Sequence, residues 1–322
     1  MMDASQDLAD TSNNTAGKSL EAVRREQTKA PHTIGFIIFV LVLTTAFGRQ
    51  LIALVTNALQ SGLNSYIILI PFVSAYLLHV DRERLARSYE RALGLAALPF
   101  LIAMAGLIFL AKIGSAGSLS TNDRNALVTL SFVCLLWSGG FLFMGRKWMA
   151  TAAFPMFFLV FLVPLPDRIV DWMETGLRLA SAEAANLFFT ITGTAAMQTG
   201  TIFQLPGITI EVAQECSGIR SSWVLFITSL VAAHLFLARP WSRLLLIAAV
   251  VPLGILRNGF RIMVIGLLCV HVDPDLIHSV IHRRGGPIFF ALSLIPLVLI
   301  LWFLRRREMA SGGAAVIVER EA

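Results

Sequence analysis

Residues 243–270 read RLLLIAAVVPLGILRNGFRIMVIGLLCV, an apolar run whose interior is broken by three strongly polar residues, Arg257, Asn258 and Arg261. A membrane-spanning helix needs about 20 mostly apolar residues, and this run exceeds that length. An arginine inside a span costs several kcal/mol unless it is paired or hydrated, so it is a functional candidate by default. The run therefore predicts a transmembrane helix that carries functional side chains.

The composition of the whole chain also indicates a membrane protein. Of its 322 residues, 56% are hydrophobic and 14% are charged, whereas an ordinary soluble domain is about 25% charged. The mean hydropathy is +0.74, and a soluble chain this apolar could not cover its surface with polar groups. The net charge of +6 does not indicate nucleic-acid binding, because the basic residues stand in short clusters between apolar runs. We expect contact with membrane lipid and with no nucleic acid.

Similar apolar runs recur along the chain and predict an all-α polytopic protein with about eight transmembrane helices. The expected spans are 34–58, 64–80, 92–113, 126–145, 148–166, 221–238, 243–270 and 287–304. Residues 1–31 are polar and are expected to form a disordered cytoplasmic tail. Residues 32–306 are expected to form the transmembrane domain, and residues 307–322 a second cytoplasmic tail.

The basic clusters orient these spans. With eight spans, every cluster falls on one side of the membrane, which the positive-inside rule assigns to the cytoplasm. The clusters comprise Lys18, Arg24, Arg25, Lys29, Arg82, Arg84, Arg87, Arg91, Arg146, Lys147, Arg239, Arg243, Arg305, Arg306 and Arg307. Both termini are then cytoplasmic. The extracytoplasmic side holds the loop near Ser118–Asn125, the stretch Pro166–Arg220 and the turn His271–Pro287.

The long extracytoplasmic stretch is expected to form a small cap. Its first part, residues 167–197, mixes charged and apolar residues, which suits a helix that lies at the interface or dips into it. Whether this part also spans the membrane is left open. Thr201–Leu205 and Ile208–Val212 are bounded by Gly200, Pro206 and Gly207, and this pattern predicts two short extended pieces.

Cys216 is the first candidate for chemistry. It stands in ECSGIR, residues 215–220, just before an apolar run, and therefore near the start of a helix at the outer interface. A thiol at a helix N-terminus near Arg220 is expected to have a lowered pKa, and a thiolate is a good nucleophile. The alternative interpretation is a buried, inert cysteine. Cys134 and Cys269 lie inside apolar runs and are expected to be small core residues.

Arg261 and His282 are candidates on the same outer side. Arg261 lies about 18 residues, or about 27 Å, from the cytoplasmic end of its span, close to the outer edge of a core about 30 Å thick. Its alternative role is that of a snorkelling membrane anchor. His282 follows His271 and His278 in a polar turn, where a histidine can act as general acid or base or be a plain loop residue. These residues fall at no recognised metal-ligand spacing, so we expect neither a metal nor a cofactor.

These segments resemble the exosortase/archaeosortase family. Asn258-Gly259-Phe260-Arg261-Ile262 is similar to the family's Asn-x-x-Arg-Ile segment, and His282 to Gly286 to its His-x-x-x-Gly segment. The resemblance runs from about Pro164 to Phe290 and is also carried by Pro164-Leu165-Pro166, Gly200, Leu205-Pro206-Gly207, Val212-Ala213, Cys216-Ser217-Gly218-Ile219-Arg220-Ser221, Phe289 and Phe290.

The resemblance implies a membrane-embedded cysteine peptidase and transpeptidase of the inner membrane. The implied catalytic residues are Cys216, Arg261 and His282. The supporting residues are Ser217, Gly218, Arg220, Asn258 and Gly286.

The partners that the resemblance implies are exported proteins that end in a short motif (PEP-CTERM-like), a transmembrane helix and a basic cluster. They would be cleaved on the extracytoplasmic face through a thioester and transferred to an acceptor. Arg257, Arg283 and Arg284 depart from the family pattern, and their roles are left open.

Two other classes of function remain as alternatives. A transporter would explain several spans and two intramembrane arginines, but it predicts internal repeats with broken helices in matching halves. We find no such repeat in the sequence. The other alternative is a noncatalytic assembly partner in exopolysaccharide export.

Overall fold

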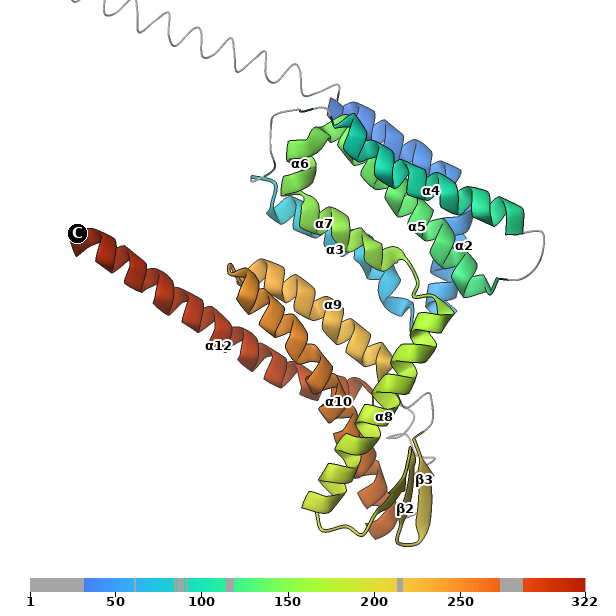
Figure 1. The fold of residues 1–322 in the computed structure, drawn as a ribbon, viewed down its shortest axis with the longest axis vertical. Coiled ribbons are helices and arrows are strands. Elements are labelled where there is room, and N and C mark those ends of the chain that lie inside the picture. The colour runs from blue at the N-terminus through green and yellow to red at the C-terminus, as the bar shows by residue number, and fades with distance from the viewer. Residues whose placement is uncertain are drawn as a thin grey trace, which may run out of the picture. The chain divides into compact units, whose positions relative to one another are not determined.

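The computed structural model describes residues 32–60, 62–83, 85, 90, 92–113, 119–212, 217–272 and 286–321. The chain forms two compact units, Met1–Pro166 and Asp167–Ala322, and Figure 1 shows the elements of each. The described part of each unit is mostly helical.

Over the described residues, the regular elements of the first unit are all helices. Its α5 begins where the Ser120 hydroxyl accepts a hydrogen bond from the Asp123 N–H at 3.0 Å, a standard N-cap. Helices α4 and α5 pack side by side (Figure 1). The helices are His32–Ala46, α2 (Gly48–Gln60), η1 (Ser65–Leu69), α3 (Ile70–Val80), α4 (Leu93–Ile113), α5 (Thr121–Gly139), η2 (Gly140–Met144), α6 (Gly145–Thr151), α7 (Ala153–Phe158) and η3 (Leu159–Leu162).

Hydrogen bonds and an ion pair identify the two ends of this first unit. At one end, the Asn122 amide donates to the Leu165 carbonyl at 2.7 Å and accepts from Asn64 at 3.4 Å. Beyond the far end of α5, Lys147 of α6 forms an ion pair with Glu90 at 2.5 Å. The chain therefore crosses this unit between Asn64 and Glu90, which it does through η1 and α3.

The second unit packs three long helices against one another. Helices α9 (Ile219–Phe236), α10 (Pro240–His271) and α12 (Gly286–Glu321) lie side by side (Figure 1) and share a buried apolar cluster. Glu308 of α12 accepts hydrogen bonds from the N–H groups of Ala238 at 2.8 Å and Arg239 at 3.0 Å. Its carboxylate thus satisfies donors at the start of α10, where the helix dipole favours a negative charge.

A helix and a small sheet complete the second unit. Helix α8 (Asp167–Ile191) packs against α10, and β1 (Met197–Thr199), β2 (Ile202–Leu205) and β3 (Ile208–Glu211) form an antiparallel sheet in that order. Phe203 pairs with Gln198 on one side and with Ile210 on the other. The two extended pieces predicted from the sequence are confirmed as β2 and β3. Strand β1 was not predicted, because Met197-Gln198-Thr199 shows no clear alternation of apolar and polar residues.

The structure confirms a polytopic helical membrane fold, although its described residues form fewer full-length spans than the eight predicted. Five of the described helices are long and apolar enough to cross a membrane, or up to seven if each of two bent helix pairs is one span. The predicted span 64–80 corresponds to the shorter apolar helix Ser65–Val80. The predicted span 148–166 is divided into α6, α7 and the 3-10 turn η3, and η3 ends before Pro164.

Candidate active site

The centre of α10 carries two arginines with different environments. Arg257 and Arg261 are four residues apart and therefore lie on the same face of the helix, one turn from each other. Arg257 is buried, with 8% of its surface exposed, and the neighbouring Asn258 is 2% exposed. Arg261 is half-buried.

Gly218 lies directly against this part of α10. It is the N-cap residue of α9 and has a left-handed backbone, with φ of 74°. A Cβ atom at this position would lie 3.0 Å from Asn258 Oδ1 and 3.1 Å from Arg257 Nη2. Both the backbone conformation and the lack of space therefore require glycine here.

Hydrogen bonds from Arg257 join α10 to the start of α9. The Arg257 Nη2 group donates to the Gly218 carbonyl at 3.1 Å and to the Ser222 hydroxyl at 3.1 Å. The same Gly218 carbonyl accepts from the Ser222 N–H at 3.0 Å and from the Ser221 hydroxyl at 3.1 Å. The first turn of α9 is thus fixed both by its own helix and by a cation from the neighbouring helix.

Small residues allow α10 to approach α8 closely at the same level. A Cβ atom at Gly259 would lie 2.6 Å from Ala184 Cβ and 3.0 Å from the Ala185 backbone nitrogen. Gly259 therefore lets the two helix backbones come together beside Asn258, and this contact sets how α10 presents its arginines.

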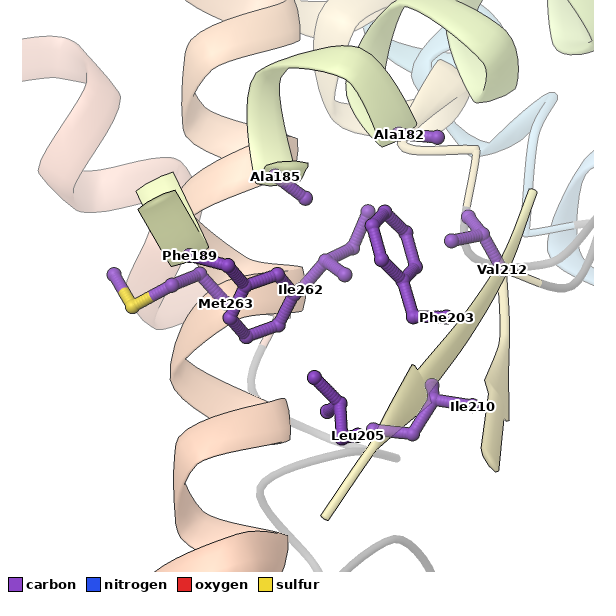
Figure 2. Packing of buried hydrophobic residues seen from close by; sticks show 9 residues of the cluster. All are labelled: Ala182, Ala185, Phe189, Phe203, Leu205, Ile210, Val212, Ile262 and Met263. Atoms are coloured by element: carbon purple, nitrogen blue, oxygen red, sulfur yellow. The ribbon is translucent and has the colours of Figure 1, made fainter. Parts of the chain in front are cut away.

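The sheet packs on α8 and on the part of α10 that follows Arg261. Figure 2 shows apolar side chains of the sheet directed toward the two helices. Phe203 is fully buried, and its ring centroid lies 5.5 Å from that of Phe189 on α8. The buried cluster comprises Ala182, Ala185, Phe189, Phe203, Leu205, Ile210, Val212, Ile262 and Met263.

The structure brings together some of the residues that the sequence predicted for the site. Gly218 and Asn258 are in close approach, and Ser217 beside them is buried. Cys216 and His282 lie outside the described residues. Arg220 is exposed on the first turn of α9, and Gly286 is the first residue of α12.

The contacts of Arg257 were not predicted from the sequence. Its spacing of four from Arg261 showed a shared helix face, but nothing in the sequence indicated that Arg257 is hydrogen-bonded to the Gly218 carbonyl. Gly218 was the available signal, because a glycine at a helix start often marks a close backbone contact.

Among the described residues, no group of three or more His, Cys, Asp or Glu side chains is arranged to hold a metal ion. Cys134 and Cys269 are both buried, as expected for packing residues in apolar spans.

The fold and these contacts define a polytopic membrane protein with a buried polar junction between two of its helices. Residues 56–299, more than half of the chain, match the family model described as transmembrane exosortase (Exosortase_EpsH). The chain therefore belongs to the transmembrane exosortase family, as the sequence motifs indicated. Searches of curated proteins and of solved structures gave no match.

Proposed function

We propose that this chain is a membrane-embedded cysteine transpeptidase that cleaves C-terminal sorting signals of exported proteins, of the PEP-CTERM-like type, and transfers the proteins to an acceptor. One observation carries the proposal. Gly218 and Arg257, 39 residues apart in sequence, are joined by a hydrogen bond, so the segment that follows Cys216 meets the Asn258–Arg261 segment. Two residues of any chain reach at most about 7 Å, so this contact limits how far Cys216 can lie from α10.

The mechanism uses Cys216 as nucleophile and His282 as proton shuttle. His282 takes the thiol proton, and the Cys216 thiolate attacks the carbonyl carbon of the scissile peptide bond. His282 then protonates the leaving nitrogen as the C–N bond breaks, which leaves a thioester. An acceptor nucleophile, such as an amine, attacks the thioester and gives a proton to His282. The C–S bond breaks, and the thiolate is regenerated.

Arg261 is assigned to the oxyanion of the tetrahedral intermediate. A charge that meets the developing oxyanion in a site shielded from water is typically worth a few kcal/mol. Arg261 is half-buried, which reduces competition from water while leaving room for a substrate. Arg257 is less suited to this task, because one of its terminal nitrogens is already bound to Gly218 and Ser222.

The sheet supports a site at the boundary between lipid and water. Helix α10 has 32 residues and is therefore about 48 Å long, which exceeds a hydrocarbon core of about 30 Å. A sheet with open edges is not found within the hydrocarbon, because its outer strands leave backbone groups without partners. Since the sheet packs on Ile262 and Met263, the segment after Arg261 belongs outside the hydrocarbon core.

A sorting motif just outside its own transmembrane helix would meet the enzyme at this level. The basic clusters predict that this boundary lies on the extracytoplasmic side of the membrane.

Replacement of the nucleophile tests the proposal. Cys216→Ser should abolish cleavage of a co-expressed candidate substrate, because an alcohol has a far higher pKa than a thiol and is a poor nucleophile without a strong base. The measurement is the size of the substrate in isolated membranes, together with the amount of the variant.

Cys134→Ser and Cys269→Ser are the matched controls, because both thiols are buried packing residues. Each should leave cleavage within about twofold of the parent, provided that the variant accumulates normally. An active Cys216→Ser variant would exclude the cysteine mechanism, and a transporter or a noncatalytic assembly partner would then be the better interpretation.

A further inference from the structure

The guanidinium of Arg257 has no part in the proposed reaction, although it is the more buried of the two arginines on α10. Only 8% of its surface is exposed. Its Nη2 group donates to the Gly218 carbonyl and the Ser222 hydroxyl, both at 3.1 Å. Its Nη1 group is buried and has no hydrogen-bond partner among the residues that the structure describes.

Stability alone gives a weak reason for a cation in this place. Burying a charge costs several kcal/mol, and well-packed apolar residues often replace buried charged groups without loss of stability. A buried donor without a partner adds to that cost and calls for a specific explanation. Its bonds to Gly218 and Ser222 indicate what the arginine does.

The Gly218 carbonyl is the point through which Arg257 can act on the proposed nucleophile. Gly218 begins α9 and stands two residues after Cys216 in the chain. Its left-handed φ of 74° turns the backbone into the helix, and its close approach to Asn258 leaves no room for a side chain. A bond from α10 to this carbonyl therefore restrains the direction from which the chain enters α9.

We propose that Arg257 is a positioning residue, which holds the Ser217-Gly218 turn against α10 and thereby sets the orientation and reactivity of Cys216. The proposal rests on the proposed function, in which Cys216 is the nucleophile and Arg261 meets the oxyanion. The two arginines on one face of α10 then have separate tasks. Arg257 fixes the nucleophile segment, and Arg261, one turn further along the helix, faces the substrate.

The test measures the thiol itself, so that it does not depend on a substrate. In a parent that carries Cys134→Ser and Cys269→Ser, Cys216 is the remaining cysteine. Its rate of alkylation by iodoacetamide is measured in membranes between about pH 6 and pH 9, which reports the thiolate fraction and its accessibility. Arg257→Met, which keeps much of the side-chain volume, should raise the midpoint of this profile by about one pH unit. That shift would slow alkylation at neutral pH about tenfold.

Arg243→Met is the matched control. The Arg243 Nε group donates to the Leu237 carbonyl at 2.8 Å, so this arginine also ties α10 to a backbone carbonyl, but at the other end of α9. A general loosening of the helix pair would slow alkylation in both variants. A positioning role predicts that Arg243→Met keeps the parent profile.

Each outcome of this experiment either supports or refutes the positioning role of Arg257. An Arg257→Met variant with the parent alkylation profile would refute the positioning role, even if substrate cleavage were lost. If the Arg257→Met variant does not accumulate in the membrane, the Arg257→Lys variant is measured instead. This variant keeps a charge but cannot reproduce the planar fork, and it too should alkylate more slowly if the proposal holds. Failure of the proposed function would appear separately, as an active Cys216→Ser variant, whatever the alkylation profiles show.

Discussion

Arg257 and Arg261, one helix turn apart on α10, have different environments although their side chains are identical. Arg257 is buried and bound to Gly218 and Ser222, whereas Arg261 is half-buried at the next turn. A planar guanidinium can offer two parallel donors to an oxyanion, but an ammonium acts as a point charge.

Arg261→Lys should therefore reduce substrate cleavage about a hundredfold or more, which is the usual effect of losing one oxyanion donor. The variant should still insert and accumulate, because a long cationic side chain at a helix level near the membrane boundary can snorkel. Single-turnover cleavage of a co-expressed substrate, normalised to the amount of enzyme in the membrane, measures the effect. Cleavage at the parent rate would show that Arg261 serves only as a membrane anchor.

At this residue scale, the sequence assigned Gly218 and Asn258 to one site but did not predict the hydrogen bonds from Arg257. Motif order placed both residues in one site, and the structure brings them into close approach. The proposed role of Arg257 could be inferred only from its contact with Gly218 in the structure. Rotation of a helix by a few tens of degrees decides which of two arginines turns inward, and that rotation is set by packing partners such as Ala184 that are remote in sequence.

At the scale of elements, the contact between α8 and α10 holds the junction in place. Gly259→Ala should destabilise the protein by about 1–3 kcal/mol, the usual cost of overpacking, because the added methyl group would lie 2.6 Å from Ala184 Cβ. Thermal unfolding of the purified protein in detergent measures this. Cleavage should also fall, since Asn258 and Arg261 belong to the same stretch of α10.

Gly176→Ala in α8 is the control for this prediction. Gly176 is exposed and has no neighbouring atom within 4 Å of an added Cβ, so the substitution should stabilise the helix by about 0.5–1 kcal/mol. Equal effects of the two substitutions would contradict the close-contact role of Gly259.

The elements were predictable from the sequence to different degrees. Apolar runs located most of the long helices to within about five residues, because the membrane leaves α-helices as the main way to satisfy backbone groups. The last helix was predicted to end at residue 304, whereas α12 continues to Glu321, because its polar end shows no apolar pattern. Glycine and proline located β2 and β3. The subdivision of the predicted span 148–166 was not visible, since residues 148–162 are nearly all apolar and hydropathy does not report where a helix bends or tightens.

At the scale of the whole molecule, the short helix Ser65–Val80 decides how the spans alternate. The described contacts place Asn64 beside Asn122, at the start of α5, and Glu90 beside Lys147 of α6, beyond the far end of α5. The chain must cross this unit between the two. Its 16 residues include a 3-10 segment, Ser65–Leu69, whose rise of about 2.0 Å per residue brings the total to about 26 Å, close to the thickness of a hydrocarbon core.

We therefore predict that this helix crosses the membrane and that both termini lie in the cytoplasm. Reporters fused after Arg82, Lys147 and Arg307 should all read cytoplasmic, whereas one fused near Asn122 should read external, because the basic clusters remain inside. The Arg82 fusion tests the short helix alone, since its reporter would lie outside if Ser65–Val80 did not cross. An external reading at Arg307 would overturn the eight-span arrangement, and with it the placement of Cys216 on the extracytoplasmic face.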